Sequence, residues 1–485
     1  MLKKFRSLFG AQDMTQGKPL PVMMRFAVPL LIGNIAQLAY NLVNAIVVGN
    51  MVNSNALSAV GASAPIQRLF FVFFMTVGTG VSVMVAQYFG AKEKENFDRT
   101  IGTAITATLV VTVFITIIGI PLIVPILNLT NVTEPEMFKF ANDYLLIMFL
   151  GTIGQGFYNV LSGILRGMGE AIFPLFVLIG TSLLNVALVL VFVGVFNMEV
   201  AGAALATIIC QYLSAAACLL RLMKMKDVTI TRALLRPSKV ILGQIARIGL
   251  PSGIQQCILS VSSMFVQSLI NSIIIVDPSG VALTTVFTAI NAAVSQVDSF
   301  STLPSQAFSM AGSTFAGQNI GAGHLDRVRQ GFKIILTTSL IVSITLIVVI
   351  SVFSEPLIGL FIDVANPNRE LILFYGAKMQ RIMVWCYLAT SFTQASSGVL
   401  RGAGDTLPVM IITIIGTVGM RMPMAYIMVR SFPSETFPAG NPSGVFWSML
   451  VCYSLVAAAC FIYYLTGRWK TKAVTKAARQ IAASR

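Results

Sequence analysis

The sequence predicts an all-α membrane protein with twelve transmembrane helices in two six-helix lobes, related by a pseudo-twofold axis along the membrane normal. Three observations predict this fold. Hydrophobic residues make up 56% of the 485 residues and charged residues only 11%, too little charge for a water-soluble chain of this length. Apolar runs long enough to cross a hydrocarbon core of about 30 Å recur along the whole chain. Finally, the two halves of the chain repeat each other's short motifs.

The repeated motifs lie at a nearly constant distance from each other. The segments at 162–170 (SGILRGMGE) and 397–405 (SGVLRGAGD) lie 235 residues apart. Those at 86–91 (AQYFGA) and 317–322 (GQNIGA) lie 231 residues apart. A tandem duplication in which each unit carries six long apolar segments is typical of a transporter with two helical bundles around a central cavity.

Apolar segments and polar connections divide the chain into five regions. These are a cytoplasmic N-terminal arm (1–24), a first lobe (25–223), a basic cytoplasmic linker (224–246), a second lobe (247–466) and a cytoplasmic tail (467–485). Six spans per lobe is an even number, so both lobes cross the membrane in the same sense. The predicted spans are 26–49, 60–88, 101–125, 140–163, 172–196, 200–223, 247–275, 283–311, 332–354, 372–399, 407–430 and 444–466.

Positive charge gathers in alternate loops and at both termini. The formal net charge is +15, and Lys and Arg concentrate in the arm, the linker, the tail and the loops after spans 2 and 8. The opposite loops hold few cations but several acids. This positive-inside distribution predicts cytoplasmic termini and favours a membrane, in contact with anionic lipid, over a nucleic-acid partner.

Composition also argues against an enzyme. The six cysteines lie inside predicted spans without metal-like spacing, and the single histidine, His324, lies in a predicted loop. No grouping of nucleophile and base is present, and no Gly-rich loop that would hold ATP. We therefore expect a monomeric transporter of a small molecule, with a proton or sodium ion for coupling and no other cofactor or metal. A channel or receptor would leave the duplication unexplained.

Polar side chains recur at helical spacing inside several predicted spans. In span 1, polar residues between Asn34 and Asn44 follow at intervals of three or four and so share one helix face. Similar stripes in spans 7 and 8 predict a polar cavity between the lobes, and the alternative is hydrogen bonding between helices of one bundle. The candidate substrate-binding residues are Asn34, Gln37, Tyr40, Asn41, Asn44, Arg68, Gln255, Gln256, Asn291, Ser295 and Gln394.

Three charged side chains stand out inside the predicted spans, where a charge costs at least about 2.5–3.5 kcal/mol to insert and marks a candidate functional site. Asp298 lies near the middle of span 8, Arg421 well inside span 11 and Arg68 within span 2. Asp298 is the acid placed deepest in the membrane, so we predict that it couples transport to a cation, with Arg421 as its neighbour. The alternatives are a fixed Asp298–Arg421 ion pair and a position for Arg68 near the membrane surface.

Arg166 and Arg401 occupy equivalent places in the repeated Leu-Arg-Gly-x-Gly turn. Glycine permits a tight turn there. We expect each arginine to cap a helix end or to pair with the acid that closes the motif, Glu170 or Asp405. A turn that is used twice at equivalent places favours a structural role.

Seven motifs spread from about residue 25 to residue 465 complete the pattern. They are 40–49 (YNLVNAIVVG), 59–66 (AVGASAPI), 86–91 (AQYFGA), 165–167 (LRG), 249–253 (GLPSG), 317–322 (GQNIGA) and 400–405 (LRGAGD). Together they resemble the bacterial branch of the multidrug and toxic compound extrusion (MATE) family. The resemblance implies twelve helices in two lobes, a V-shaped central cavity, and efflux of drugs, usually amphipathic organic cations, in exchange for protons or sodium ions.

The chain departs from this family pattern in its first lobe. Many relatives carry an acid in helix 1 where this sequence has Asn44, and some carry acids in helices 7 and 10, where it has Gln255 and Gln394. The acid that many bacterial members carry in helix 8 is kept as Asp298. The resemblance therefore implies coupling through Asp298. Asn44 and Arg68 leave one alternative open, a related exporter of an anionic, zwitterionic or lipid-like metabolite with atypical coupling.

Overall fold

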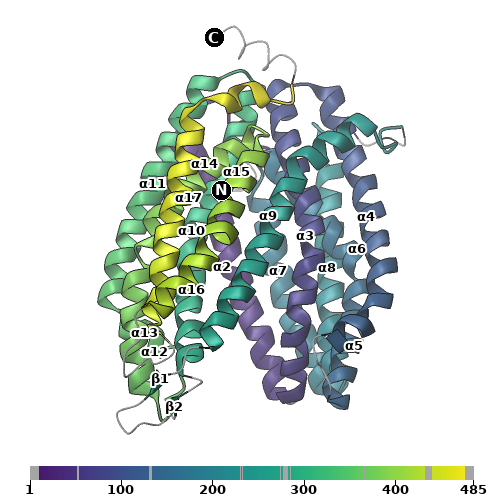
Figure 1. Cartoon of the computed structure of the whole chain (residues 1–485). Coiled ribbons are helices and arrows are strands. Elements are labelled where there is room, and N and C mark those ends of the chain that lie inside the picture. The colour runs from purple at the N-terminus through teal and green to yellow at the C-terminus, as the bar shows by residue number, and fades with distance from the viewer. Residues whose placement is uncertain are drawn as a thin grey trace, which may run out of the picture.

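A computed structural model shows a bundle of long helices in two groups. Figure 1 shows most helices of the first half, from purple to blue, on one side and those of the second half, from green to yellow, on the other. The structure describes residues 10–51, 54–129, 134–229, 231, 233–272, 275–276, 282–283, 286–364, 366–431 and 440–475.

The first half of the chain forms six helical spans. The pair α5–α6 is one span that bends by 50° where the two helices meet. The helices are α2 (Pro19–Met51), α3 (Ser54–Ala91), α4 (Lys94–Leu129), α5 (Pro135–Leu150), α6 (Thr152–Gly167), α7 (Ile172–Val189) with its π-helical continuation η1 (Leu190–Val195), and α8 (Glu199–Met223).

The second half repeats this order and adds a small hairpin after its first helix, in which Ile275 pairs with Leu283. The hairpin is an addition to the predicted all-α fold. The elements are α9 (Lys239–Asn271), β1 (Ile275–Val276), β2 (Ala282–Leu283), α10 (Val286–Gly321), α11 (Leu325–Val352), α12 (Ser354–Gly359), α13 (Arg369–Met383), α14 (Cys386–Gly402), α15 (Thr406–Ile414), η2 (Ile415–Arg421), α16 (Met422–Arg430), α17 (Ser443–Leu465) and η3 (Arg468–Lys472).

The helical segments confirm the twelve predicted spans. Nine described helices are long and apolar enough to cross a membrane, and the α5–α6 pair adds a tenth. The α10 helix and the α13–α14 pair complete the twelve, and both are less apolar because they carry more polar and charged side chains. Helices α2 and α9 begin earlier than predicted, at Pro19 and Lys239. The predicted spans begin next to a cation, after Arg25 and at Arg247, whereas both helices also include the apolar residues that precede it.

Buried apolar residues form clusters private to one lobe and clusters shared by both. One cluster lies within the first lobe and two lie within the second. In a shared cluster, Phe26 of α2 packs with Phe308 and Phe315 of α10. In another, Ile245 of α9 packs with α3, α4 and α6. The N-terminal halves of α2 and α9 therefore attach each lobe to the other.

The shared contacts lie at one end of the molecule. We call it the terminal end, because segments 10–16 and 468–475 pack there, and we call the opposite end, with β1 and β2, the hairpin end (Figure 1). A Cβ atom added to Gly90 would lie 2.0 Å from the carbonyl oxygen of Gln318, and one added to Gly321 would lie 2.0 Å from that of Gln87. Since the two glycines are repeat-related, the lobes meet symmetrically and without space for a side chain.

The acids of the repeated turns have different partners in the two lobes. Glu170 accepts hydrogen bonds from Arg221 of α8, at 2.8 Å from Nη2 and 3.0 Å from Nε. Asp405 accepts one from the hydroxyl of Tyr463 of α17 at 2.8 Å. Burial raises the pKa of the Glu170 carboxyl, and Arg221 acts against that rise. The expected pairing of these acids with the arginines of their own turns is therefore wrong, because the last helix of each lobe supplies the partner.

Candidate functional site

A cavity of about 220 Å³ lies inside the second lobe. It has room for several water molecules or one end of an organic ligand, since a water molecule takes about 30 Å³ in the liquid. Helices α9, α10 and α17 and the segment η2 supply its polar lining, and α13 adds an apolar residue. The polar lining residues are Ser263, Gln267, Asn291, Ser295, Asp298, Arg421 and Tyr453.

Amide side chains of α9 and α10 form one hydrogen-bonded wall of this cavity. Nδ2 of Asn291 donates to Oε1 of Gln267 at 3.2 Å, and Nε2 of Gln267 donates to Oδ1 of Asn271 at 2.8 Å. Asn291, Ser295 and Asp298 share one face of α10, because they follow at helical intervals. The polar stripes of α9 and α10 therefore bond these two helices together, which is the alternative that the sequence left open, and they also line a cavity within the second lobe.

Asp298 and Arg421 face the cavity together. They form no direct ion pair among the described residues. The Asp298 carboxyl nevertheless interacts electrostatically with the Arg421 guanidinium and by a hydrogen bond with the Tyr387 phenol. Arg421 is only 7% exposed, and its Nε has no hydrogen-bond partner in the described part of the chain. Its guanidinium carbon lies 5.9 Å from the ring centroid of Tyr453. Burying a cation whose Nε lacks a hydrogen-bond partner costs free energy. The cavity therefore suits a charged group or a water molecule beside Arg421.

The local helix geometry brings Arg421 to this position. Arg421 is the last residue of η2, a π-helical segment within the span that runs from α15 to α16. A π-helical turn is wider than an α-helical turn and often occurs at a functional site, because it changes which side chains face a neighbour. The repeat-related span of the first lobe also contains a π-helical segment, η1, but that segment carries no charged residue.

The structure gathers four predicted site residues in this cavity, namely Asn291, Ser295, Asp298 and Arg421. Three others from the second lobe do not line it. Nε2 of Gln255 donates to the hydroxyl of Thr413 at 3.0 Å, Gln256 is exposed on α9, and the Gln394 amide oxygen accepts from Ser397 at 3.5 Å.

The predicted residues of the first lobe do not line this cavity either. On α2, Gln37 is exposed, whereas Asn34 and Tyr40 are half-buried. The side chains of Asn41, Asn44 and Arg68 lie outside the described residues. A common cavity for the stripes of α2, α9 and α10 therefore stays a prediction.

Three polar lining residues, Ser263, Gln267 and Tyr453, were not among the candidate substrate-binding residues. Ser263 and Gln267 lie four residues apart on the polar stripe of α9 for which the sequence predicted a place along a cavity. Tyr453 gave no such signal. It lies on the apolar helix α17, and only its proximity to Arg421 in space gives it a place at the site.

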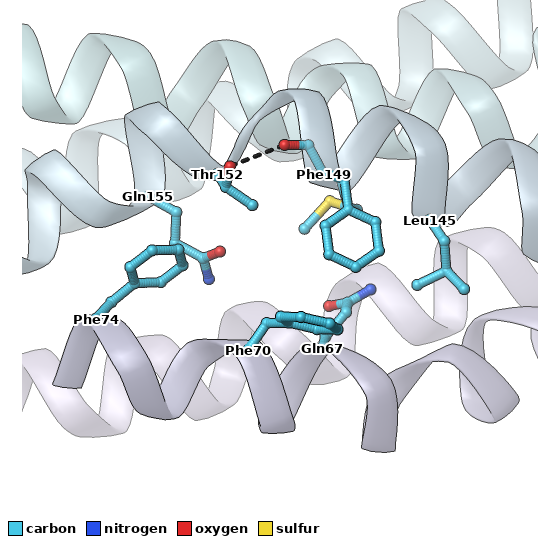
Figure 2. Close-up of a pocket in the computed structure, with 8 residues that line it drawn as sticks. Gln67, Phe70, Phe74, Leu145, Phe149, Thr152 and Gln155 are labelled. Carbon is cyan, nitrogen blue, oxygen red and sulfur yellow. Dashed lines mark hydrogen bonds between the residues drawn. The ribbon is translucent and has the colours of Figure 1, made fainter. Parts of the chain in front are cut away.

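The first lobe contains a much smaller cavity, shown in Figure 2, between α3 and the α5–α6 pair. Its volume is about 20 Å³, which has room for about one water molecule. The amides of Gln67 and Gln155 point into it among three phenylalanines, and the hydroxyl of Thr152 donates to the carbonyl oxygen of Phe149 at 2.8 Å. Its described lining has no charged side chain, in contrast to the lining of the second-lobe cavity.

Comparison with known proteins places this chain among membrane transporters. The MatE family model matches residues 29–191 and 251–427. The probable multidrug resistance protein YoeA of Bacillus subtilis is 28% identical over 95% of this chain and 97% of its own length. The probable multidrug resistance protein NorM of Thermotoga maritima is 26% identical over 93% of both chains.

The solved structures agree on the fold. A multidrug resistance MATE family transporter in an outward-facing conformation superposes with a TM-score of 0.85 at 24% identity, over 94% of this chain and 97% of that one. This likeness confirms the two-lobe helical fold, and the family model covers more than half of the chain. The chain therefore belongs to the MatE family of membrane transporters and is not an enzyme.

Proposed function

We propose that this protein is a secondary active efflux transporter that exports amphipathic organic compounds by alternating access, in exchange for a proton or a sodium ion. Membership of the MatE family supports a transporter. The relatives named as multidrug resistance proteins support the substrate class. The observation that carries the proposal is the second-lobe cavity, in which Asp298 and Arg421 face the same space without pairing.

The distribution of apolar cores supports alternating access. The private cores lie within single lobes, whereas the shared clusters at the terminal end depend on contact between lobes. Rocking of one lobe against the other would leave the private cores intact and separate the shared ones. The lobes thus have the construction of two rigid bodies, with the terminal end closed in the conformation described.

Charge supports a cytoplasmic location for the terminal end. Lys92 lies between α3 and α4 at this end, and Lys94 and Arg99 lie in the first two turns of α4, whereas Glu134 and Glu136 lie at the hairpin end. Positive charge in short loops marks the cytoplasmic side. We infer that both termini are cytoplasmic, that the membrane is a bacterial plasma membrane, and that the cavity opens toward the outside.

Electrostatic exclusion is the coupling mechanism that we propose. With the Asp298 carboxylate ionised, its charge and that of Arg421 cancel, and a cationic substrate can approach the carboxylate. With a proton or sodium ion bound there, the cavity has a net positive charge and repels the cation. Because two unit charges interact by about 2 kcal/mol at 8 Å and an effective dielectric constant of 20, one ligand displaces the other.

The remaining assignments follow from this mechanism. The coupling ion is the only cofactor that we propose, and the substrate is the small-molecule partner. A single chain contains both lobes and the whole cavity, so we propose a monomer. Asn34, Gln37 and Tyr40 of α2 remain predicted substrate contacts on the first-lobe side.

Proton release in detergent tests this function. We expect the purified protein, in weak buffer, to release about one proton for each tetraphenylphosphonium cation bound. Asp298→Asn is expected to abolish the release, while Glu355→Gln, which changes an exposed acid on α12, is expected to keep it. If sodium is the coupling ion, sodium competes with the cation in the parent but not in Asp298→Asn. Proton release by Asp298→Asn that equals a release observed for the parent, or sodium competition that persists in Asp298→Asn, would contradict the proposal.

A further inference from the structure

Two repeat-related glutamines cross the interface between the lobes at the terminal end. Gln87 lies on α3 in the first lobe and Gln318 lies on α10 in the second, and both are fully buried at 0% exposure. Nε2 of Gln87 donates to the carbonyl oxygen of Gly402 at 2.8 Å, and Nε2 of Gln318 donates to that of Gly167 at 3.0 Å. Each glutamine of one repeated motif thus binds the glycine turn of the other repeated motif in the opposite lobe.

The other end of each amide holds a terminal segment. Oε1 of Gln318 accepts from the backbone N–H of Met14 at 2.8 Å, and Oε1 of Gln87 accepts from that of Val474 at 2.6 Å. Met14 precedes α2 of the first lobe, and Val474 follows α17 of the second lobe. Each glutamine therefore binds a glycine turn of the opposite lobe and a terminal segment that is continuous in sequence with the opposite lobe, and the four hydrogen bonds follow a twofold pattern.

Further contacts fix the N-terminal segment in this position. The backbone N–H of Gln12 donates to the carbonyl oxygen of Met168 at 3.1 Å, beside Gly169, whose φ of +84° and lack of a side chain leave room for Gln12. From the second lobe, Nη2 of Arg327 donates to the carbonyl oxygen of Gln16 at 2.9 Å. The segment is therefore bonded to both lobes.

The C-terminal segment is fixed on the other side of the pseudo-twofold axis. Trp469 is 1% exposed and stacks on Tyr464 with ring centroids 5.6 Å apart, and its Nε1 donates to the Tyr464 carbonyl oxygen at 3.0 Å. Ala473, next to Val474, is fully buried. This segment holds Gln87 from the second lobe, as the N-terminal segment holds Gln318 from the first.

We propose that Gln87 and Gln318 are positioning residues that form a gate at the terminal end, and that segments 10–16 and 469–475 are straps that this gate holds and releases together. The inference rests on the alternating access proposed above. When the lobes part at the terminal end, the bonds of the glutamines to Gly402 and Gly167 break together, because each joins opposite lobes, and each amide then loses the position in which it holds Val474 or Met14. Both straps are then freed by the same motion, so either strap reports the state of the whole gate.

Hydrogen exchange at the straps tests this inference. In Gln318→Met, which keeps the side-chain length but removes both hydrogen bonds, we expect exchange to rise by about threefold or more in residues 12–16. The decisive expectation is an equal rise in hydrogen exchange in residues 470–475, the segment in which Val474 bonds to Gln87 and not to Gln318. Gln87→Met should produce the same two changes. Gln211→Met on α8, which changes a half-buried glutamine inside the first lobe, is the matched control and should change neither strap.

A purely local packing role predicts a different result. In that case each variant would raise exchange only in the strap that it contacts, and the gate would be refuted; unchanged exchange in both straps would refute it as well. If a methionine variant fails to purify as a single species, the asparagine variant replaces it, since its shorter amide cannot reach both partners. Hydrogen exchange is measured without transport. If the parent protein transports nothing, the proposed function is contradicted, but the exchange result still tests the gate.

Discussion

The two lobes match each other at the terminal end and differ inside the membrane. At the terminal end, Gln87 and Gln318 make equivalent hydrogen bonds to Gly402 and Gly167 across the interface. Inside the membrane, the second lobe holds a cavity of about 220 Å³ with a buried cation and an acid, whereas the first-lobe cavity measures about 20 Å³ and its described lining is uncharged.

This difference shows in which part of a duplicated chain the two copies have to stay alike. Where the lobes contact each other, each repeat is shaped by the other, so a change in one requires a change in its copy. A cavity within one lobe has no such constraint. The second-lobe cavity can then carry charged side chains that the described first-lobe cavity lacks. The predictions below test the symmetric part first and the asymmetric part afterwards.

The largest effect is expected where the lobes touch. Gly90→Ala and Gly321→Ala would each place a Cβ atom 2.0 Å from a backbone oxygen of the other lobe. Relieving such overlap requires backbone movement, so we expect a loss of about 3 kcal/mol in the stability of the closed terminal end. The thermal unfolding midpoint in detergent measures it. Gly243→Ala on α9, where nothing lies within 4 Å, is the matched control and should stabilise by up to about 1 kcal/mol through helix propensity.

Equal tolerance of all three alanine variants would contradict the close symmetric contact. A loss at only one of Gly90 and Gly321 would instead show that the symmetry of the interface is incomplete. Both outcomes bear on the terminal end alone and leave the second-lobe cavity untouched.

An intermediate effect is expected at the acids of the repeated turns. Glu170→Gln leaves Arg221 without its ionised partner, and since Arg221 is only 26% exposed we expect a loss of about 2 kcal/mol in unfolding free energy. Asp405→Asn keeps an oxygen that can accept from Tyr463, so its loss should be about 1 kcal/mol. Denaturant or thermal unfolding in detergent measures both. A larger loss for Asp405→Asn would reverse this comparison of the lobes.

A smaller effect, on binding rather than folding, is expected at Arg421. Arg421→Ala leaves the cavity with a net negative charge when Asp298 is ionised, so we expect a cationic substrate to bind about tenfold more tightly. Turnover should fall, because the cation then leaves more slowly. Arg421→Lys keeps the charge and should stay within about twofold of the parent. Equilibrium binding of tetraphenylphosphonium measures both, and weaker binding to Arg421→Ala would show that Arg421 contacts the substrate directly.

The sequence predicted those features that depend on local composition or on repetition. Twelve spans follow from hydropathy, and the duplication follows from motifs such as Leu-Arg-Gly-x-Gly. Asp298 could be chosen as a candidate because it is an acid in the middle of an apolar span, and it does line a cavity.

Contacts between distant segments could not be predicted in the same way. Gln87 and Gly402 are 315 residues apart, and Met14 and Gln318 are 304 residues apart. The sequence marked both glutamine motifs as repeated but gave no sign that each binds the other's turn. Nor could it show that Arg221, rather than Arg166, pairs with Glu170, since that choice depends on how α8 packs against the α6–α7 turn.

The central claim is that the second lobe carries the coupling through Asp298. Efflux of an amphipathic dye cation from proteoliposomes tests it most directly, under an imposed proton gradient and separately under a sodium gradient. We predict that one of these gradients drives efflux by the parent protein and that Asp298→Asn falls to the rate of protein-free liposomes. Gradient-driven efflux by Asp298→Asn at the parent rate would contradict the claim and move the coupling group outside the second-lobe cavity.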